Sequence, residues 1–274
     1  VGLVTRHDIG IQQMSVNKGL TRGLAEHGLH MVYAEFAEDE MLTRGVRPRL
    51  LEEWCADGLV IHYAHNVPDP VRDMVAECGI PAVWVNAKGQ RNCVYPDDEQ
   101  GGRLAVESLI ERGFRDIAYV LRDIPPQPPL GVGPHYSESD RRLGYEAGMK
   151  AANLAPRILS PPDVTYLPAS DAWHAWRTWL HSMELPDAFL CYDAHTAGGV
   201  LSALTAEGLI VPVDVIVQCF HTDKLDLWGP LGPAVIPVPL HEASRQAAAM
   251  VSSMIESGKT ETASVRVSYK QARS

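Results

Sequence analysis

Short apolar runs rich in β-branched residues alternate with amphipathic stretches along the whole chain. In its first half the apolar runs predict strands at Val1–Thr5, Leu29–Ala34, Gly58–His62, Ala82–Asn86 and Ile117–Leu121. Helices are predicted between them near 12–27, 42–55, 69–78 and 98–112. Continuous apolar strands separated by helices are typical of a parallel sheet that is covered on both faces.

The alternation stops once and then resumes. After Leu121 the segment RDIPPQPPLGVGPHYSESD is rich in proline and glycine, so it predicts a crossover and a loop. Beyond it we expect helices at 138–152, 171–183, 195–207 and 240–257, and strands at Val164–Leu167, Ala188–Tyr192, Val215–Phe220, Ala234–Val238 and Ala263–Val267. Two successive sets of alternating strands and helices predict an α/β fold with two doubly wound parallel-sheet lobes.

The segment Val94–Val120 gives the clearest local pattern. Its sequence, VYPDDEQGGRLAVESLIERGFRDIAYV, predicts a strand, an acid-rich turn, a helix, a glycine stop and a second strand. Gly102, Val106 and Leu109 recur at spacings of four and three residues, so one face of the helix must lie against a sheet. We therefore interpret the segment as a complete β-α-β unit.

Composition excludes several classes of protein. The formal net charge is −10 and the isoelectric point is about 5.5, so this chain should not hold DNA unaided, because lysine and arginine supply most non-specific affinity for phosphates. Five cysteines without a CxxC pair argue against a disulfide framework or a zinc ribbon and favour a reducing cytoplasm. No apolar run approaches the ~20 residues that would span a bilayer.

Enzyme motifs are incomplete. No GxGxxG follows the first strand, and no GxSxG elbow exists. The tripeptide GKT at 258–260 imitates the end of a P-loop, but Ser253 stands where the first glycine should be, and the tripeptide follows a helix. His241-Glu242 lacks the second histidine of a zinc protease motif. We predict no catalytic activity and no cofactor.

Polar residues gather just past the predicted strands, where open α/β sheets bind their ligands. These residues are Arg6, His7, Asp8, His62, Tyr63, His65, Asn86, Lys88, Arg122, Asp193, His195, His221, Thr222 and Asp223. Their histidines and cationic groups predict a site suited to hydroxyls or to negative charge. A metal site built from His7, His62, His195 or His221 is an alternative, but no local HxxxH spacing supports it, and we predict none. The tryptophan stripe Trp173, Trp176 and Trp179 favours core packing over a sugar platform, and Trp228 is a weak stacking candidate.

Several motifs together resemble the effector-binding core of the LacI/GalR family of bacterial transcriptional regulators, over essentially the whole chain. They are the segment Val94–Val120, RRLGY at 141–145, PDAFLCYD at 186–193 and GLIVPVDVIV at 208–217. The resemblance implies a periplasmic-binding-protein-like fold of type I, with a central cleft between two discontinuous lobes. We expect an N-terminal lobe of residues 1–121 plus 237–260, and a C-terminal lobe of residues 122–236 plus 261–274. A helix-turn-helix domain is expected upstream of Val1.

The resemblance also implies which residues bind the effector: Gln12, Gln13, His62, Asn86, Ser137, Arg141, Asp193 and His221. Arg141 is the strongest candidate, because a guanidinium offers five donors in a fixed geometry. The chain departs from the family pattern at His221, where an aspartate is usual, at Asp193-Ala194 in place of Asn-Asp, and at Gln12-Gln13 in place of an aromatic pair.

The implied function is the ligand-binding and dimerisation domain of a cytoplasmic LacI-type regulator. It would sense a sugar, a polyol or a sugar acid and control DNA binding allosterically, as a homodimer that contacts operator DNA through the upstream domain, with no membrane association. One alternative is a periplasmic sugar-binding protein of an ABC transporter, whose cleaved leader would explain the start at Val1 but which the unpaired cysteines disfavour. Another is an enzyme that uses the histidine-rich site.

Overall fold

The computed structural model describes residues 1–6, 10–36, 56–62, 69–122, 134–164, 167–222 and 232–270, with all their side chains except those of 4–6, 10–13, 34–36 and 70. The chain divides into two compact units. Unit 1 contains Val1–Pro96, Leu130–Tyr136 and Pro239–Ser268, and unit 2 contains Asp97–Pro129, Ser137–Val238 and Tyr269–Ser274. Each unit is an α/β structure built on a parallel sheet, as the sequence predicted.

The sheet of unit 1 has six strands in the order β11-β5-β4-β3-β1-β2, and every neighbouring pair is parallel. The strands are β1 (Gly2–Arg6), β2 (Val32–Phe36), β3 (Leu59–His62), β4 (Ala82–Val85), β5 (Cys93–Pro96) and β11 (Val265–Val267). Every residue of β3, β4 and β5 is buried, which agrees with the continuous apolar runs in the sequence.

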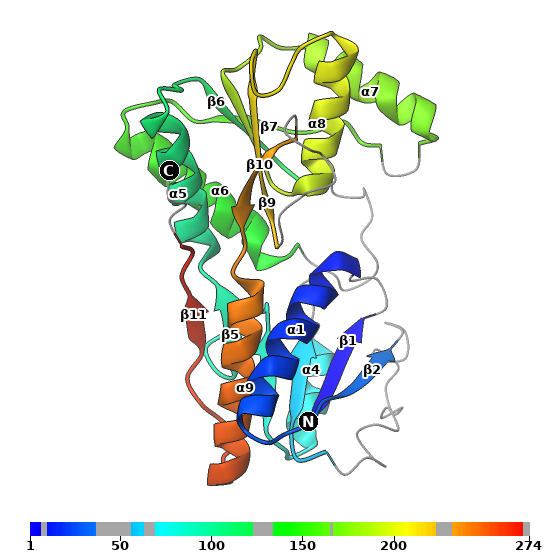
Figure 1. The fold of residues 1–274 in the computed structure, drawn as a ribbon, viewed down its shortest axis with the longest axis vertical. Helices are drawn as coiled ribbons and strands as arrows, with labels where there is room; N and C mark the ends of the chain where they lie inside the picture. Colours follow the sequence, from blue (N-terminus) through cyan, green and yellow to red (C-terminus); the bar gives the residue numbers. More distant parts are fainter. Residues whose placement is uncertain are drawn as a thin grey trace. The chain divides into compact units, whose positions relative to one another are not determined.

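Helices cover both faces of this sheet: α1 (Gly10–Glu26), α4 (Asp69–Glu77) and α9 (Leu240–Ser257). On one face, Val71 and Val75 of α4 pack against Leu59 and Ile61 of β3. On the other face, α1 and α9 lie side by side in close contact (Figure 1). A Cβ atom at Gly23 of α1 would come within 2.7 Å of the side chain of Ala248, so glycine permits this close approach.

Unit 2 has a five-stranded parallel sheet in the order β10-β9-β8-β6-β7. Its strands are β6 (Ile117–Val120), β7 (Arg157–Leu159), β8 (Ala188–Cys191), β9 (Ile216–His221) and β10 (Ala234–Pro237). Its helices are α5 (Asp98–Glu111), α6 (Tyr136–Ala151), α7 (Ala169–His181) and α8 (Ala194–Ala206). Helices α5 and α6 cover one face of this sheet, and α7 and α8 cover the other (Figure 1).

Helices α5 and α6 cross at two glycines. A Cβ atom at Gly102 would overlap the carbonyl oxygen of Arg141, and one at Gly144 would overlap the carbonyl oxygen of Glu99. The predicted apolar face of α5 is therefore buried, with Val106 fully enclosed, and it packs against α6 as well as against the sheet.

The tryptophan stripe of α7 is mainly core, as predicted. Trp176 is buried in the cluster between the sheet and α8, and Gly199 of α8 leaves the space for its ring. Trp179 packs partly against the same cluster and donates a hydrogen bond from Nε1 to the carbonyl oxygen of Ser160. Trp173 is about one-third exposed, at 37%. Trp228 lies outside the described residues.

The two ends of the predicted strand at Val164–Leu167 are not in a strand, and the two residues between them lie outside the description. The strand that pairs with β6 at this edge is β7, at Arg157–Leu159. Ile158 at its centre is 38% exposed, because an edge strand is covered less completely than a central one. Strand β7 therefore lacks the continuous apolar run that identified the other strands. The predicted helix at 42–55 falls outside the described residues.

The segment Val94–Val120 is not a single β-α-β unit. Strand β5 pairs with β4 and β11 in unit 1, whereas β6 pairs with β7 and β8 in unit 2. The chain passes from unit 1 to unit 2 at Pro96–Asp97, so α5 belongs to unit 2. Periodicity identified the three elements correctly, but it carries no information on which sheet a strand joins.

The boundaries of the units differ accordingly from the expected lobes. Residues 97–121, expected in the N-terminal lobe, lie in unit 2. Strand β11, expected in the C-terminal lobe, pairs in parallel with β5 in unit 1, with Val267 opposite Pro96. The reason is that β5 would otherwise be the edge of that sheet, and β11 supplies its missing hydrogen-bond partners. Helix α9 lies in unit 1, where it was expected.

The end of α9 agrees with the sequence analysis. Gly258 ends α9 in the left-handed conformation with φ of +65°, so the tripeptide at 258–260 is a helix stop rather than a phosphate loop. Cys78, Cys93, Cys191 and Cys219 are free thiols. Among the residues that the structure describes, no helix is both long and apolar enough to cross a membrane.

Replacing Gly144 by alanine should destabilise unit 2. Alanine normally favours a helix by about 1 kcal/mol over glycine, but here its methyl group would enter the backbone of α5, and overpacking of this kind costs about 1–3 kcal/mol. Urea unfolding of the parent and the Gly144→Ala variant measures the difference. The exposed neighbour Leu143 is the control, because Leu143→Ala should change the free energy of unfolding by only about 0.5 kcal/mol. A Gly144→Ala variant as stable as the parent would contradict the close crossing.

Candidate functional site

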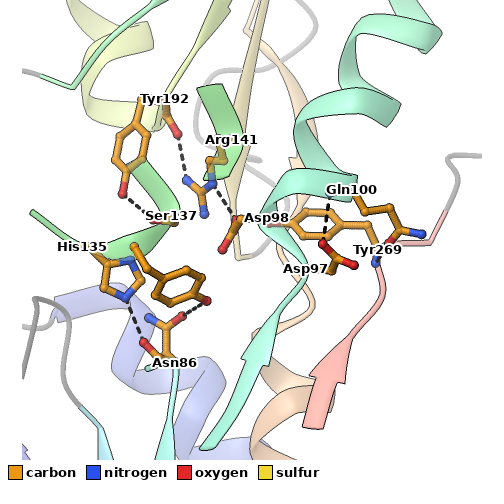
Figure 2. A network of polar contacts seen from close by, with 10 residues as sticks. Asn86, Asp97, Asp98, Gln100, His135, Ser137, Arg141, Tyr192 and Tyr269 are labelled. Carbon is orange, nitrogen blue, oxygen red and sulfur yellow. Dashed lines mark hydrogen bonds and ion pairs between the residues drawn. The ribbon is translucent and has the colours of Figure 1, made fainter. Parts of the chain in front are cut away.

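Arg141 of α6 lies at the centre of a buried polar network in unit 2, which Figure 2 shows. Its Nε donates to Asp98 Oδ1 over 2.7 Å, and its Nη1 donates to the carbonyl oxygen of Tyr192 over 2.9 Å. The guanidinium carbon also lies 4.8 Å from the ring centre of Tyr192 and 4.5 Å from that of Phe220. We call Asp98, Arg141, Tyr192, Phe220 and Tyr269 the arginine cluster.

Asp98 is the anion of this cluster. It is the first residue of α5 and is 1% exposed. Its Oδ1 accepts hydrogen bonds from Arg141 and, over 2.6 Å, from the hydroxyl of Tyr269. Its Oδ2 is also buried and has no hydrogen-bond partner among the described residues. The preceding acid, Asp97, instead caps α5, because its Oδ1 accepts from the backbone N–H of Gln100 over 3.1 Å.

The ion pair keeps Arg141 charged. Burial lowers the pKa of Arg141, but the carboxylate of Asp98 opposes this strongly enough that the pKa lies well above its usual value. Burial raises the pKa of Tyr192 and raises that of Tyr269 well above its usual range. At neutral pH the cluster therefore contains a charged guanidinium, which is paired with Asp98, and two neutral phenols.

Ser137 and Arg122 contact the cluster through Tyr192. The hydroxyls of Ser137 and Tyr192 are 2.8 Å apart and hydrogen-bonded (Figure 2). The guanidinium carbon of Arg122 lies 5.8 Å from the ring centre of Tyr192, and its Nη1 donates to Glu138 Oε1 over 3.0 Å. Each of the two arginines beside Tyr192 is thus paired with its own carboxylate.

Asp193 and His221 follow the carboxyl ends of β8 and β9, and both are partly exposed. Asp193 caps helix α8, since its Oδ1 accepts from the backbone N–H of Thr196 over 2.8 Å. His221 ends β9 directly after Phe220, and its carbonyl oxygen accepts from the N–H of Val238 over 2.9 Å. In the sequence, Asp193 directly follows Tyr192 and His221 directly follows Phe220. Both residues are therefore adjacent to members of the arginine cluster.

A second group of polar residues lies in unit 1. Asn86 follows β4 with φ of +60°, a conformation that is uncommon for residues other than glycine. Its carbonyl oxygen is 2.8 Å from Nε2 of His135, so that nitrogen must carry the hydrogen. Its Oδ1 accepts a longer bond, of 3.4 Å, from the hydroxyl of Tyr136. The rings of His135 and Tyr136 are in contact, with centres 4.4 Å apart.

His62 ends β3 and is fully buried. Burial, and secondly the nearby His135, lower the pKa of His62 to about 3. His62 is therefore a neutral imidazole at physiological pH and does not provide a cation for a ligand.

The predicted site residues divide between the two units. Ser137, Arg141, Asp193 and His221 lie in unit 2, where Ser137 and Arg141 both contact Tyr192. His62 and Asn86 lie in unit 1. Gln12 and Gln13 lie in α1, and their side chains are outside the description. The structure thus brings Ser137 and Arg141 together around Tyr192.

Several residues of these networks were missed. Asp98 was interpreted only as a negative charge at a helix N-terminus, which is the role that Asp97 has. Tyr192 and Phe220 are the last residues of two predicted apolar strands, so the sequence indicates that they are core residues. The sequence gives no signal for Tyr269 or His135, because their importance comes from contacts with residues far away in the chain.

Metal binding receives no support from the described part of the chain, where no three histidine, cysteine, aspartate or glutamate side chains lie close enough to hold an ion. His195 is exposed, His62 is buried, and His7 lies outside the description.

The chain is similar to a known domain family and to curated repressors. Residues 106–272 match the family described as "Periplasmic binding protein-like domain". The HTH-type transcriptional repressor PurR of Actinobacillus pleuropneumoniae serotype 3 (strain JL03) is 27% identical over 61% of this chain and 44% of its own length. The arabinose metabolism transcriptional repressor of Geobacillus stearothermophilus is 26% identical over 93% of this chain and 70% of its own length. The chain therefore spans less than half the length of PurR.

A solved structure of the lac repressor dimer, bound to operator and the anti-inducer ONPF, superposes on this chain with a TM-score of 0.75. The match covers 97% of this chain and 90% of the repressor chain at 18% sequence identity. This likeness supports the same fold of two parallel-sheet α/β units.

The buried histidine at the end of β3 predicts a pH dependence of stability. The folded state keeps His62 neutral down to a pKa of about 3, whereas the unfolded chain protonates it near pH 6.5. The unfolded state therefore binds the extra proton between these values, and the free energy of unfolding falls as the pH falls, by up to about 1.4 kcal/mol per pH unit from this residue.

Urea unfolding at about pH 7 and about pH 5 tests this effect. The loss of stability between the two should be smaller in His62→Gln than in the parent, while the exposed His27, changed to glutamine, should leave the loss unaltered. Equal losses in the parent and His62→Gln would show that the histidine is not held neutral.

Proposed function

Because the chain belongs to the periplasmic binding protein-like domain family and has the effector-binding core of the LacI/GalR regulators, we propose that it senses a small polar molecule and controls the binding of operator DNA. The similar curated proteins are transcriptional repressors, which supports this role over that of a transporter component or an enzyme. A regulator of this kind works in the cytoplasm and as a homodimer.

DNA binding itself is proposed for a separate helix-turn-helix domain that precedes Val1 in the full protein. The net charge of −10 supports a separate DNA-binding domain, because this chain lacks the excess of cationic side chains that binding to phosphates requires. Two such domains in a dimer would read operator half-sites one helical turn apart, ~34 Å.

The observation that carries the proposed site is the buried Oδ2 of Asp98. A carboxylate oxygen that loses water without gaining a donor costs free energy, so a hydrogen bond from outside the described residues would stabilise this atom. The hydroxyl of a sugar or polyol is a suitable donor. We infer that the effector binds at the arginine cluster and donates to Asp98 Oδ2, with Ser137, Asp193 and His221 of unit 2 at the same site.

The charges of these residues favour a neutral effector. Arg141 is paired with Asp98 and Arg122 with Glu138, and Asp193 adds a further carboxylate. An anionic ligand would therefore meet no unbalanced cation among the described residues of the cluster, and its own acceptors would face the free oxygen of Asp98. We propose a neutral sugar or polyol in preference to a sugar acid.

Sensing requires that the effector binds one conformational state of the regulator more tightly than another. The shift in DNA binding can be no larger than that difference in affinity, which is typically ~1–3 kcal/mol.

A thermal-shift screen of neutral pentoses, hexoses, disaccharides and sugar alcohols tests the proposal, because a ligand that binds only the folded state raises the unfolding temperature. At least one compound should stabilise the parent chain. Its affinity should fall by about 10-fold to 100-fold in Asp98→Asn, since a hydrogen bond to a charged group contributes about 1.5–3 kcal/mol.

The matched control is Tyr269→Phe. This change removes a hydrogen bond to Oδ1 of the same carboxylate but leaves Oδ2 in place, so the affinity should stay within about threefold of the parent. Circular dichroism establishes that both variants are folded. A folded Asp98→Asn variant that binds the compound as tightly as the parent would overturn the site, and a panel without any stabilising compound would overturn the proposed ligand class.

A further inference from the structure

A groove of about 470 Å³ runs along α9 on the surface of unit 1. Arg245 and Ser257 of α9 both line it, so it extends for about 18 Å along the helix, at 1.5 Å per residue. The opposite wall is the chain that returns from the end of α9 to β11 (Figure 1). Binding sites for small molecules typically have volumes of about 300–1,000 Å³, so the groove is large enough for one. Every residue that lines it belongs to unit 1.

The second wall of the groove is held in place by Asn92. Its Nδ2 donates to the carbonyl oxygen of Thr260 over 2.8 Å, and its Oδ1 accepts from the backbone N–H of Thr262 over 2.8 Å. The backbone N–H of Asn92 donates to the carbonyl oxygen of Thr262 over 3.0 Å. Because three hydrogen bonds fix this segment, the groove is formed before a ligand binds.

Apolar side chains line both walls of the groove. Met250 and Met254 come from α9, and Val265 of β11, which is 36% exposed, comes from the other wall. The smaller apolar lining residues are Ala249 and Ala263. Unbranched methionine side chains adapt to the shape of a bound apolar group. Since the groove is elongated along α9, it suits a linear hydrocarbon chain better than a compact ring.

One of the charged residues that line the groove has no counter-ion. Arg245 is paired with Glu242, with Nη2 and Oε1 2.9 Å apart, and Glu261 is paired with Arg91. Lys259 is exposed, and no carboxylate lies within ion-pair distance of it in the part of the chain that the structure describes. It follows Gly258, the residue that ends α9. The groove therefore carries an unbalanced positive charge at the end where the helix stops.

We propose that this groove is a second binding site, for a free carboxylic acid with a linear aliphatic chain of medium length. The carboxylate pairs with Lys259, and the chain lies along α9 against Met250 and Val265. An amine of the same length would bring a second positive charge to Lys259. The proposal is independent of the effector site, because the groove belongs to unit 1 and the arginine cluster was defined by contacts in unit 2.

Nuclear magnetic resonance of the ¹⁵N-labelled chain tests the site with octanoate, octylammonium and butanoate. Octanoate should shift the amide signals of Met250, Ala263 and Val265 in a saturable manner, but not those of Lys150 and Asn153, which line a different surface pocket. It should bind about fivefold more tightly than octylammonium, which is the effect of an exposed ion pair. Butanoate should bind about tenfold more weakly than octanoate, because its shorter chain buries less apolar surface.

Two variants separate the charge from the apolar contact, and each has a matched control. Lys259→Gln should abolish the preference for octanoate over octylammonium, whereas Lys150→Gln on α6 should preserve it. Met250→Gln keeps the length of the side chain and should weaken octanoate binding about threefold. The same change at Met14 of α1, which is 55% exposed and does not line the groove, should leave octanoate binding unaltered.

Octylammonium that binds the parent chain as tightly as octanoate would overturn the proposed ligand class. The site itself would be overturned if octanoate did not shift the groove signals saturably, or if Met250→Gln bound octanoate as tightly as the parent. A preference for octanoate that persists in Lys259→Gln, with circular dichroism showing a folded protein, would show that Lys259 does not bind the carboxylate.

Discussion

The buried ion pair between Asp98 and Arg141 is the interaction on which the described arrangement of unit 2 depends most. Removing one partner of such a pair typically costs about 3–5 kcal/mol, because the remaining charge is left without water and without a counter-ion. An exposed pair such as Arg103–Glu107 on the same helix typically contributes only about 0–1 kcal/mol. The buried pair therefore constrains the elements around it, whereas the surface pair does not.

The packing of two helices puts the pair in place. Asp98 begins α5 and Arg141 lies in α6, and these helices approach so closely at Gly102 and Gly144 that a methyl group at either position would overlap the backbone of the other helix. Tyr269, which follows β11, adds a hydrogen bond to the same carboxylate oxygen. The fold of unit 2 thus brings together groups from three distant parts of the chain and leaves the second oxygen of Asp98 without a partner in the described residues.

The sequence predicts the elements of this protein better than their partners. Helix α9 matches the predicted range of 240–257, because its apolar spacing is regular over several turns. Strand β7 was missed, since a short edge strand with an exposed central isoleucine has no apolar run. The assignment of β5 and β6 to one β-α-β unit was wrong for a different reason. Strand pairing depends on the path of the chain through space, which local periodicity does not encode.

The candidate site shows the same limit. Arg141 was identified through a resemblance to a family motif, and the structure places it in a polar network. Asp98 has an equally specific position, but in the sequence it is one of three successive acids, Asp97 to Glu99, of which the first is the cap. Only the contact with Arg141, 43 residues later, distinguishes it from its neighbours. Tyr269 is identified only by its contacts with residues about 170 positions earlier.

An ion pair without net charge, with one free acceptor, should bind an uncharged, hydroxylated effector in preference to an anion. Calorimetric titration with glucose and glucuronic acid, and with galactose and galacturonic acid, tests this preference most directly. The two members of each pair differ only in the carboxylate at C6. The hexose that binds should do so at least about tenfold more tightly than its acid. An acid that binds as tightly as its neutral parent, or more tightly, would contradict it.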